Sequence, residues 1–169
     1  MKKSMIRMTV SLAVASVTLA VLVAALPIAR AMTMPSATGQ TKIDAGTSNC
    51  HVAISAPANN QDYHLNSNPD TVRMPYAVSW EDHRGAGASR ATHSFTLQTE
   101  HLSNVVSVSK SVDTYGGDVA GSDTLWRNVT NVYHGQYVNI TFSASVTGPI
   151  GSGCPASDSF TLNYHFVYQ

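Results

Sequence analysis

Residues 135–169 read GQYVNITFSASVTGPIGSGCPASDSFTLNYHFVYQ, and two parts of this stretch alternate between apolar and polar residues. Successive side chains of a β-strand point to opposite faces of a sheet, so the alternation predicts strands over 136–147 and 158–168. Together they would form an antiparallel hairpin in which each strand buries one face. Only Val167 breaks the pattern, and the inward residues would be Val138, Ile140, Phe142, Ala144, Val146, Phe160, Leu162, Tyr164, Phe166 and Tyr168.

Five further strands are predicted upstream of this hairpin, at residues 50–55, 71–80, 93–101, 104–112 and 125–132. Within 71–80, Pro75 predicts an edge or a bulge, because proline donates no hydrogen bond to a ladder. No stretch has a helical period of any length. Seven short strands separated by turn residues predict an all-β fold, an immunoglobulin-like seven-stranded antiparallel β-sandwich over residues 50–169.

Residues 1–31 have the organisation of a secretory signal peptide. A basic start precedes an apolar run from 10 to 28, and Ala29-Arg30-Ala31 places small residues at −3 and −1 of a cleavage site. We expect cleavage after Ala31. The alternative is an uncleaved anchor, because about 19 apolar residues are long enough to span a bilayer. The small and polar residues 32–49 are predicted to form a flexible leader.

Charge and cysteine content restrict the compartment and the partners. Four of the ten basic residues lie before residue 32, so the exported part has six basic and ten acidic residues and a net charge of −4 with histidine neutral. Nucleic acid is not expected as a partner, since its binding requires a basic surface. Cys50 and Cys154 both follow the signal peptide, which predicts a disulfide in an oxidising compartment, with two free thiols as the alternative. We expect a periplasmic or cell-surface protein that has no membrane contact after cleavage.

The sequence contains no catalytic motif, so we expect neither an enzyme nor a cofactor. Seven histidines raise the alternative of a periplasmic copper- or zinc-binding protein, with His51 and His83 as candidate ligands. No closely spaced histidine pair is present, and we therefore expect no metal site. A glycine-rich segment contains three aspartates, Asp113, Asp118 and Asp123. The segment could be a solvated loop, and the alternative is a site that binds Ca²⁺ weakly.

Residues 71–80, TVRMPYAVSW, contain a Met-Pro-x-x-Val-Ser-Trp segment, and residues 160–169 alternate up to a penultimate Tyr168. The first segment resembles one found in subunits of bacterial chaperone–usher fimbriae, and the second is similar to the C-terminal strand that pilin chaperones recognise. The resemblance implies an immunoglobulin-like subunit whose N-terminal arm fills the groove of a neighbour. Residues 32–49 lack the alternation of such an arm, and seven strands leave no groove open. A self-complete monomer is the alternative.

The function expected from these patterns is that of a non-enzymatic surface or binding module, related to fimbriae as an adhesion or structural subunit, that forms homo-oligomers or a fibre. A structural envelope protein with no specific ligand is a further alternative. Its partner would be a protein or a glycan at the cell surface. In a seven-stranded sandwich the loops after the second, fourth and sixth strands lie at one end, here 81–92, 113–124 and 148–157. Loops on a rigid scaffold are where binding residues concentrate. The predicted partner-contacting residues are Asp82, His83, Arg84 and Tyr115.

Overall fold

A computed structural model describes residues 30–37 and 39–168, with side chains omitted for residues 40–42. Within this part the chain contains ten β-strands and no helix. Each of the seven predicted strands has a counterpart, but the predicted count of seven is wrong, because three further strands are present. The strands are β1 (Met32–Thr33), β2 (Gln40–Gly46), β3 (Cys50–Ala56), β4 (Asp62–Leu65), β5 (Asp70–Asp82), β6 (Ala91–His101), β7 (Asn104–Thr114), β8 (Val119–Val132), β9 (Gln136–Thr147) and β10 (Ala156–Tyr168).

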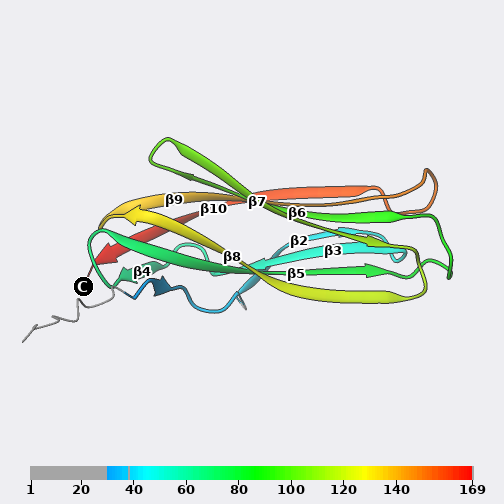
Figure 1. Cartoon of the computed structure of the whole chain (residues 1–169), viewed down its shortest axis with the longest axis horizontal. Helices are drawn as coiled ribbons and strands as arrows, with labels where there is room; N and C mark the ends of the chain where they lie inside the picture. The colour runs from blue at the N-terminus through cyan, green and yellow to red at the C-terminus, as the bar shows by residue number, and fades with distance from the viewer. Residues whose placement is uncertain (1–29, 38, 169) are drawn as a thin grey trace, which may run out of the picture.

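The strands form two sheets that pack against each other along the length of the molecule (Figure 1). One sheet has the order β2-β3-β5-β8, with β1 beside the first part of β5. The other has the order β4-β10-β9-β6-β7. Neighbouring strands are antiparallel except in the pairs β1–β5 and β4–β10. The protein is therefore an all-β, two-sheet structure of the β-sandwich kind.

The predicted C-terminal hairpin is confirmed, because β9 and β10 pair antiparallel with Phe160 opposite Phe142 and Leu162 opposite Ile140. The inward residues of β9 are all buried. In β10 Phe160 is half-buried and stacks on Phe142 at 4.9 Å between ring centroids. Tyr168, which was expected to face inward, is 50% exposed at the end of the strand.

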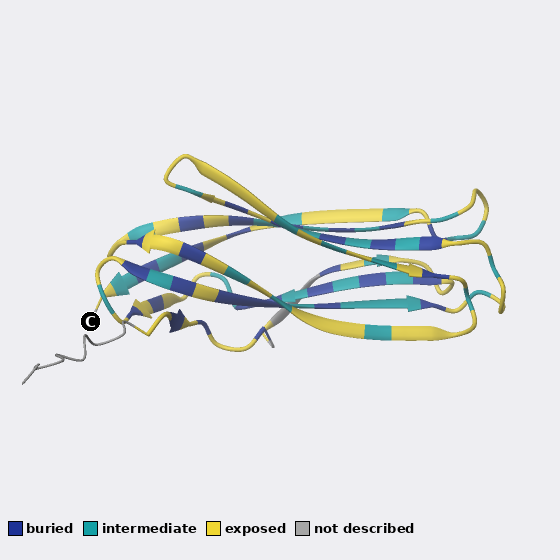
Figure 2. Cartoon of the chain, viewed as in Figure 1, coloured by how far each residue is buried: buried dark blue, intermediate teal, exposed yellow. Residues whose placement is uncertain are grey.

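The core lies between the two sheets, and Figure 2 shows buried positions alternating with exposed ones along the strands. Every second residue of β5 from Val72 to Val78 is buried, and so are Phe95 and Leu97 on β6. Burial of one such side chain is worth about 1.5–3 kcal/mol relative to leaving it in water. The period-two pattern that predicted the strands is thus the pattern that fills the core.

The prediction of a flexible leader over 32–49 is wrong. Met32 pairs with Val72 through β1, and β2 pairs along β3 with Ile43 completely buried. Two features explain why the sequence pattern did not predict these strands. The apolar residues are few, and a shift of register between Thr41 and Ile43 breaks the alternation of β2.

The short strand β4 was also missed, because 50–69 was read as one strand followed by a polar connection. β4 has only four residues and pairs parallel with the end of β10. Its Tyr63 and Leu65 face the core and are buried. Tyr63 also donates a hydrogen bond from its hydroxyl to the carbonyl of Ala58, at 2.5 Å.

Pro75 lies inside a long strand without a bulge. It sits opposite Trp126 of β8, and the only register shift between these strands lies between Asp70 and Val72. Along its other edge, β5 pairs with β1 at Val72 and with β3 from Ala77 onward. Pro75 therefore occupies the interval between two neighbouring strands, where a missing donor costs little.

The predicted signal peptide lies almost wholly outside the described residues, which begin at Arg30. In the part of the chain that the structure describes, no helix is long and apolar enough to cross a membrane.

Candidate functional site

The loop end that was predicted to contact a partner is organised around the carboxylate of Asp82. Its Oδ1 accepts hydrogen bonds from Arg84 Nε at 2.9 Å and from the Arg84 backbone N–H at 3.1 Å. Its Oδ2 accepts from Arg84 Nη2 at 2.8 Å, from Thr114 Oγ1 at 2.5 Å and from Gly116 N at 2.9 Å. One side chain thus joins β5, β7 and the turn that follows β7.

Asp82 and Arg84 were predicted to contact a partner, but both side chains are buried. Asp82 is 0% exposed, and the Arg84 side chain is only 8% exposed. The hydrogen bonds from Arg84 hold the pKa of the Asp82 carboxyl well below its usual range, against the opposing effect of burial. A carboxylate that is saturated by internal donors stabilises the loops and is not free to contact a partner. His83 and Tyr115 remain accessible, Tyr115 at 58% exposure.

The predicted disulfide is confirmed, and it lies at the same end of the molecule. Cys50 and Cys154 are bonded, and both are completely buried. Next to the bridge, Thr47 Oγ1 donates to the carbonyl of Gly153 at 2.6 Å, and Asn49 Nδ2 donates to the carbonyl of Ser152 at 3.2 Å. The start of β3 is therefore fastened to the loop between β9 and β10.

The two candidate metal ligands both lie beside Glu81. His51 is the cross-strand neighbour of Glu81, and His83 Nε2 lies 3.2 Å from the Glu81 carboxylate. Each histidine has a carboxylate partner of its own, Asp44 for His51 and Asp118 for His83. Asp118 and then Glu81 raise the pKa of His83. Among the described residues, no group of three or more His, Cys, Asp or Glu has a geometry that could hold a metal ion.

The three aspartates considered for Ca²⁺ are placed on different elements. Asp113 is the penultimate residue of β7 and accepts a hydrogen bond from Thr92 Oγ1 at 2.6 Å. Asp118 lies in the turn before β8, and Asp123 lies within β8 and pairs with Lys110. The segment is mostly strand rather than the loop that was predicted, so the three carboxylates do not form one cluster.

A second region with functional character is the outer face of the sheet that contains β10, β9, β6 and β7. These strands pair in register, so their outward side chains form rows across the sheet. In three successive rows all but one of the side chains carry a hydroxyl group, and we call this set of three rows the hydroxyl face. From β10 to β7 its rows are Ser157, Ser145, Ser94, Ser111; then Ser159, Ser143, Thr96, Ser109; then Thr161, Thr141, Gln98, Ser107.

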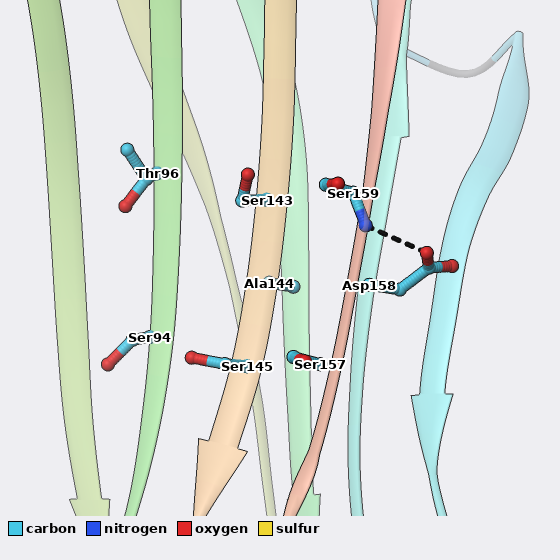
Figure 3. Close-up of a pocket in the computed structure, with 8 residues that line it drawn as sticks. All are labelled: Ser94, Thr96, Ser143, Ala144, Ser145, Ser157, Asp158 and Ser159. Carbon is cyan, nitrogen blue, oxygen red and sulfur yellow. Dashed lines mark hydrogen bonds between the residues drawn. The ribbon is translucent and has the colours of Figure 1, made fainter.

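The regular spacing of the hydroxyl face follows from strand geometry. Neighbouring strands lie about 4.8 Å apart, and successive outward residues on one strand lie about 6.7 Å apart. Figure 3 shows side chains of this face from three neighbouring strands side by side, while Asp158 extends away from them. Together with Ala144 and Asp158, these side chains line an open hollow of about 440 Å³. The result is an array of neutral donors and acceptors at fixed intervals.

Several hydroxyl groups of the hydroxyl face do not form hydrogen bonds with one another. Thr141 and Thr161 share a hydrogen bond at 2.8 Å, as do Ser94 and Ser111 at 3.1 Å. Among the described residues, the hydroxyls of Thr96, Ser143, Ser145, Ser157 and Ser159 have no hydrogen-bond partner. Each hydroxyl offers one donor and two acceptor positions, so these groups are available to an external ligand.

The hydroxyl face continues at one end into an aromatic and amide cluster. Tyr137 is 61% exposed and stacks on His165, with ring centroids 4.4 Å apart. His165 Nδ1 is held by the Asp62 carboxylate at 2.6 Å. In the next row Asn163 Nδ2 donates to Asn139 Oδ1 at 2.7 Å. This arrangement fixes one ring and two amides next to the hydroxyl rows.

Sequence reasoning placed these residues outward but gave them no role. The signal was present in the identity of the alternating polar positions, which are Ser and Thr rather than charged residues along 141–147 and at 157, 159 and 161. Only the pairing of four strands turns scattered serines into rows, because the register is not visible in the sequence.

Comparison with protein-family models, with curated proteins and with solved structures finds no match to this chain. The site must therefore be interpreted from its own residues. Its chemistry is that of neutral hydrogen bonding over an extended face, with one exposed ring at the end.

Proposed function

We propose that this protein is an exported, non-enzymatic, immunoglobulin-like β-sandwich that binds a glycan in the periplasm or at the cell surface. The hydroxyl face and the adjoining Tyr137 form the binding surface. The observation that carries this proposal is the set of in-register, neutral hydroxyls that lack partners among the described residues. A protein partner at the cell surface is the competing ligand class.

The strand order supports the immunoglobulin-like part of the proposal. β3, β5 and β8 take the places of strands A, B and E, and β10, β9, β6 and β7 take those of G, F, C and C′. β4 pairs parallel with β10, as a second half of the first strand would. In this interpretation β1 and β2 are additions that extend the first sheet.

The chemistry of the face favours a neutral glycan. A polysaccharide presents hydroxyls at repeating intervals, and each can exchange hydrogen bonds with a serine or threonine hydroxyl. An exposed tyrosine ring offers an apolar platform with a polar tip for one sugar ring. Because the rows carry no charge, we expect binding that depends weakly on salt concentration.

A role related to fimbriae belongs to the same proposal, as an adhesive module on the cell surface. Two features favour a self-complete module over one that needs a donated strand. β10 pairs with β9 and β4, and β1 and β2 pair with the protein's own sheet. We expect the purified protein to be a folded monomer in the absence of any partner subunit, which sedimentation velocity would measure.

The alternative of metal binding through His51 and His83 rests on their common neighbour Glu81. Isothermal titration with copper or zinc tests it. A tight isotherm that is lost in a His51→Ala, His83→Ala variant would favour metal binding over the glycan proposal. Heat of dilution alone would remove it.

The glycan proposal is tested with a panel of neutral polysaccharides and a matched pair of double variants. Ser143→Gln with Ser159→Gln places two larger side chains on a cross-strand serine pair of the hydroxyl face. Ser79→Gln with Ser122→Gln makes the same change at a cross-strand pair of the other sheet, on its outer face. We expect the first variant to weaken binding roughly tenfold and the second to leave it unchanged. Equal binding by both variants would contradict the proposal.

A further inference from the structure

Arg127 is a partly buried cation that has no counter-ion. It lies on β8 opposite Met74, on the side of the strand that faces the other sheet. Its Nε atom is shielded from solvent and has no hydrogen-bond partner. Arg127 forms no ion pair with any described residue, whereas Arg84 pairs with Asp82 at 2.8 Å and Arg90 with Asp113 at 3.7 Å.

A pocket of about 230 Å³ lies next to this guanidinium, between the beginning of β7 and the end of β8. Thr99 lines the same pocket. It is only 3% exposed, and its hydroxyl oxygen has no hydrogen-bond partner. Val106 and Val129 supply apolar parts of the wall, and none of the residues that line the pocket is acidic.

The neighbouring tyrosine does not neutralise Arg127. Tyr76 is completely buried, and its hydroxyl has no hydrogen-bond partner. Burial raises the pKa of Tyr76 to about 12, against the opposing charge of Arg127. The phenol therefore stays protonated at neutral pH and supplies no negative charge.

A cation that is withdrawn from water without a partner is costly, whereas a paired and hydrogen-bonded cation is tolerated. The pocket supplies what an external anion needs: a positive charge, an unused hydroxyl donor and no competing carboxylate. The planar guanidinium fork matches the two oxygens of a carboxylate, and the apolar wall accommodates an aliphatic group.

We propose that this pocket binds the carboxylate of a small aliphatic acid, with Arg127 pairing with its oxygens and Thr99 donating from its hydroxyl. Val106 and Val129 contact the aliphatic part of the ligand. The site is separate from the hydroxyl face, so the two proposals succeed or fail independently.

The test is a titration of the purified protein with isobutyrate, its neutral isostere isobutyramide and inorganic phosphate at constant ionic strength. Backbone amide shifts of Thr99, Val106 and Val129 report occupancy of the pocket. We expect saturable shifts with isobutyrate and at least roughly tenfold weaker binding of both other probes, since only isobutyrate combines the charge with the correct shape.

Variants assign the interaction to the two side chains. Arg127→Met should weaken isobutyrate binding roughly tenfold or more, Arg127→Lys should retain part of it, and Thr99→Val should weaken it several-fold. Arg73→Met is the matched control, because Arg73 is exposed and stacks on Trp126, outside the pocket. That variant should bind like the wild type.

Several results would overturn the proposal. These are an absence of saturable shifts, equal binding of isobutyramide, phosphate binding as tight as that of isobutyrate, or unchanged binding by Arg127→Met. If Arg127→Met does not fold, Arg127→Lys and the comparison of isobutyrate with isobutyramide on the wild type decide the question.

Discussion

The disulfide end of the molecule and the hydroxyl face use polar side chains in opposite ways. At the disulfide end, Asp82 accepts five hydrogen bonds from three residues, and side chains next to the bridge bond to backbone groups across the loops. On the hydroxyl face, residues such as Ser143 and Thr96 have no partner among the described residues. Charged residues such as Asp82 and Arg84 are concentrated at the disulfide end, whereas the rows of the hydroxyl face contain none.

A cluster of charged residues in loops is therefore not by itself a binding site. Charges that satisfy each other hold loops in place, and the free energy of their interactions contributes to folding. Groups that are exposed, fixed by regular structure and unsatisfied are the ones left for a ligand. We therefore expect substitutions at the disulfide end to change stability and those on the hydroxyl face to change binding.

The largest effect is expected on removal of the disulfide. Cys50→Ala with Cys154→Ala opens a link between residues 104 positions apart in the chain. The chain-entropy model gives a loss of about 4–5 kcal/mol in the free energy of unfolding for a loop of this length. Urea denaturation of the wild type and the variant measures it. A loss below about 1 kcal/mol would show that the disulfide end does not stabilise the fold as described.

Asp82→Asn should have the next largest effect, about 3 kcal/mol, because it leaves the buried Arg84 guanidinium without its charge partner. The sign of the pH dependence follows from the lowered pKa of Asp82. Its contribution is complete above about pH 4, the usual value for the unfolded chain, and is lost as the pH falls further toward the folded value.

The measurement is urea denaturation of both proteins between neutral pH and pH 2. The difference between wild type and Asp82→Asn should shrink below about pH 4. A difference that stays constant over this range would contradict the assignment. Glycan binding by the folded variant should equal that of the wild type.

A smaller difference in stability is expected between alanine substitutions of two glycines at the disulfide end. A Cβ added at Gly148 would lie 2.7 Å from the Cβ of Cys154, whereas one added at Gly85 would meet no atom within 4 Å. Gly148→Ala should therefore cost about 1–3 kcal/mol through overpacking beside the disulfide. Gly85→Ala should change the free energy of unfolding by less than about 0.5 kcal/mol. Equal melting temperatures of the two variants would count against the close packing around the bridge.

The smallest effect on stability is expected for Tyr137, which adjoins the hydroxyl face. Tyr137→Ala removes a side chain that is 61% exposed, so the free energy of unfolding should change by about 0.5 kcal/mol or less. Glycan affinity should nevertheless fall several-fold, because the ring that stacks on His165 is lost. A large loss of stability without loss of affinity would assign Tyr137 to the core and remove it from the binding surface.

Regular alternation made most of the fold predictable. β5, β6, β9 and β10 each place one face in the core, and a period of two in the sequence records this directly. β2 was missed because its register shift interrupts that period, and β4 because four residues give too short a pattern. The disulfide followed from the even number of cysteines in the predicted exported part of the chain.

The candidate site was less predictable, for a physical reason. The sequence shows that Asp82 and Arg84 are charged, but not that they are buried against each other. It shows that Ser143, Ser159 and Thr96 are outward, but not that they share a row. Both facts depend on pairings between residues far apart in the chain, and local propensity does not encode these pairings.

Chemical-shift mapping with a soluble neutral oligosaccharide from the binding panel locates the glycan-binding surface on the protein. We predict that the shifted backbone amides cluster along the rows of the hydroxyl face, including Ser143, Ser159 and Thr96, and extend to Tyr137. Shifts that cluster instead at His83, Tyr115 and the loop from 148 to 155, with no change on the hydroxyl face, would place glycan binding at the disulfide end and exclude the hydroxyl face as the binding surface.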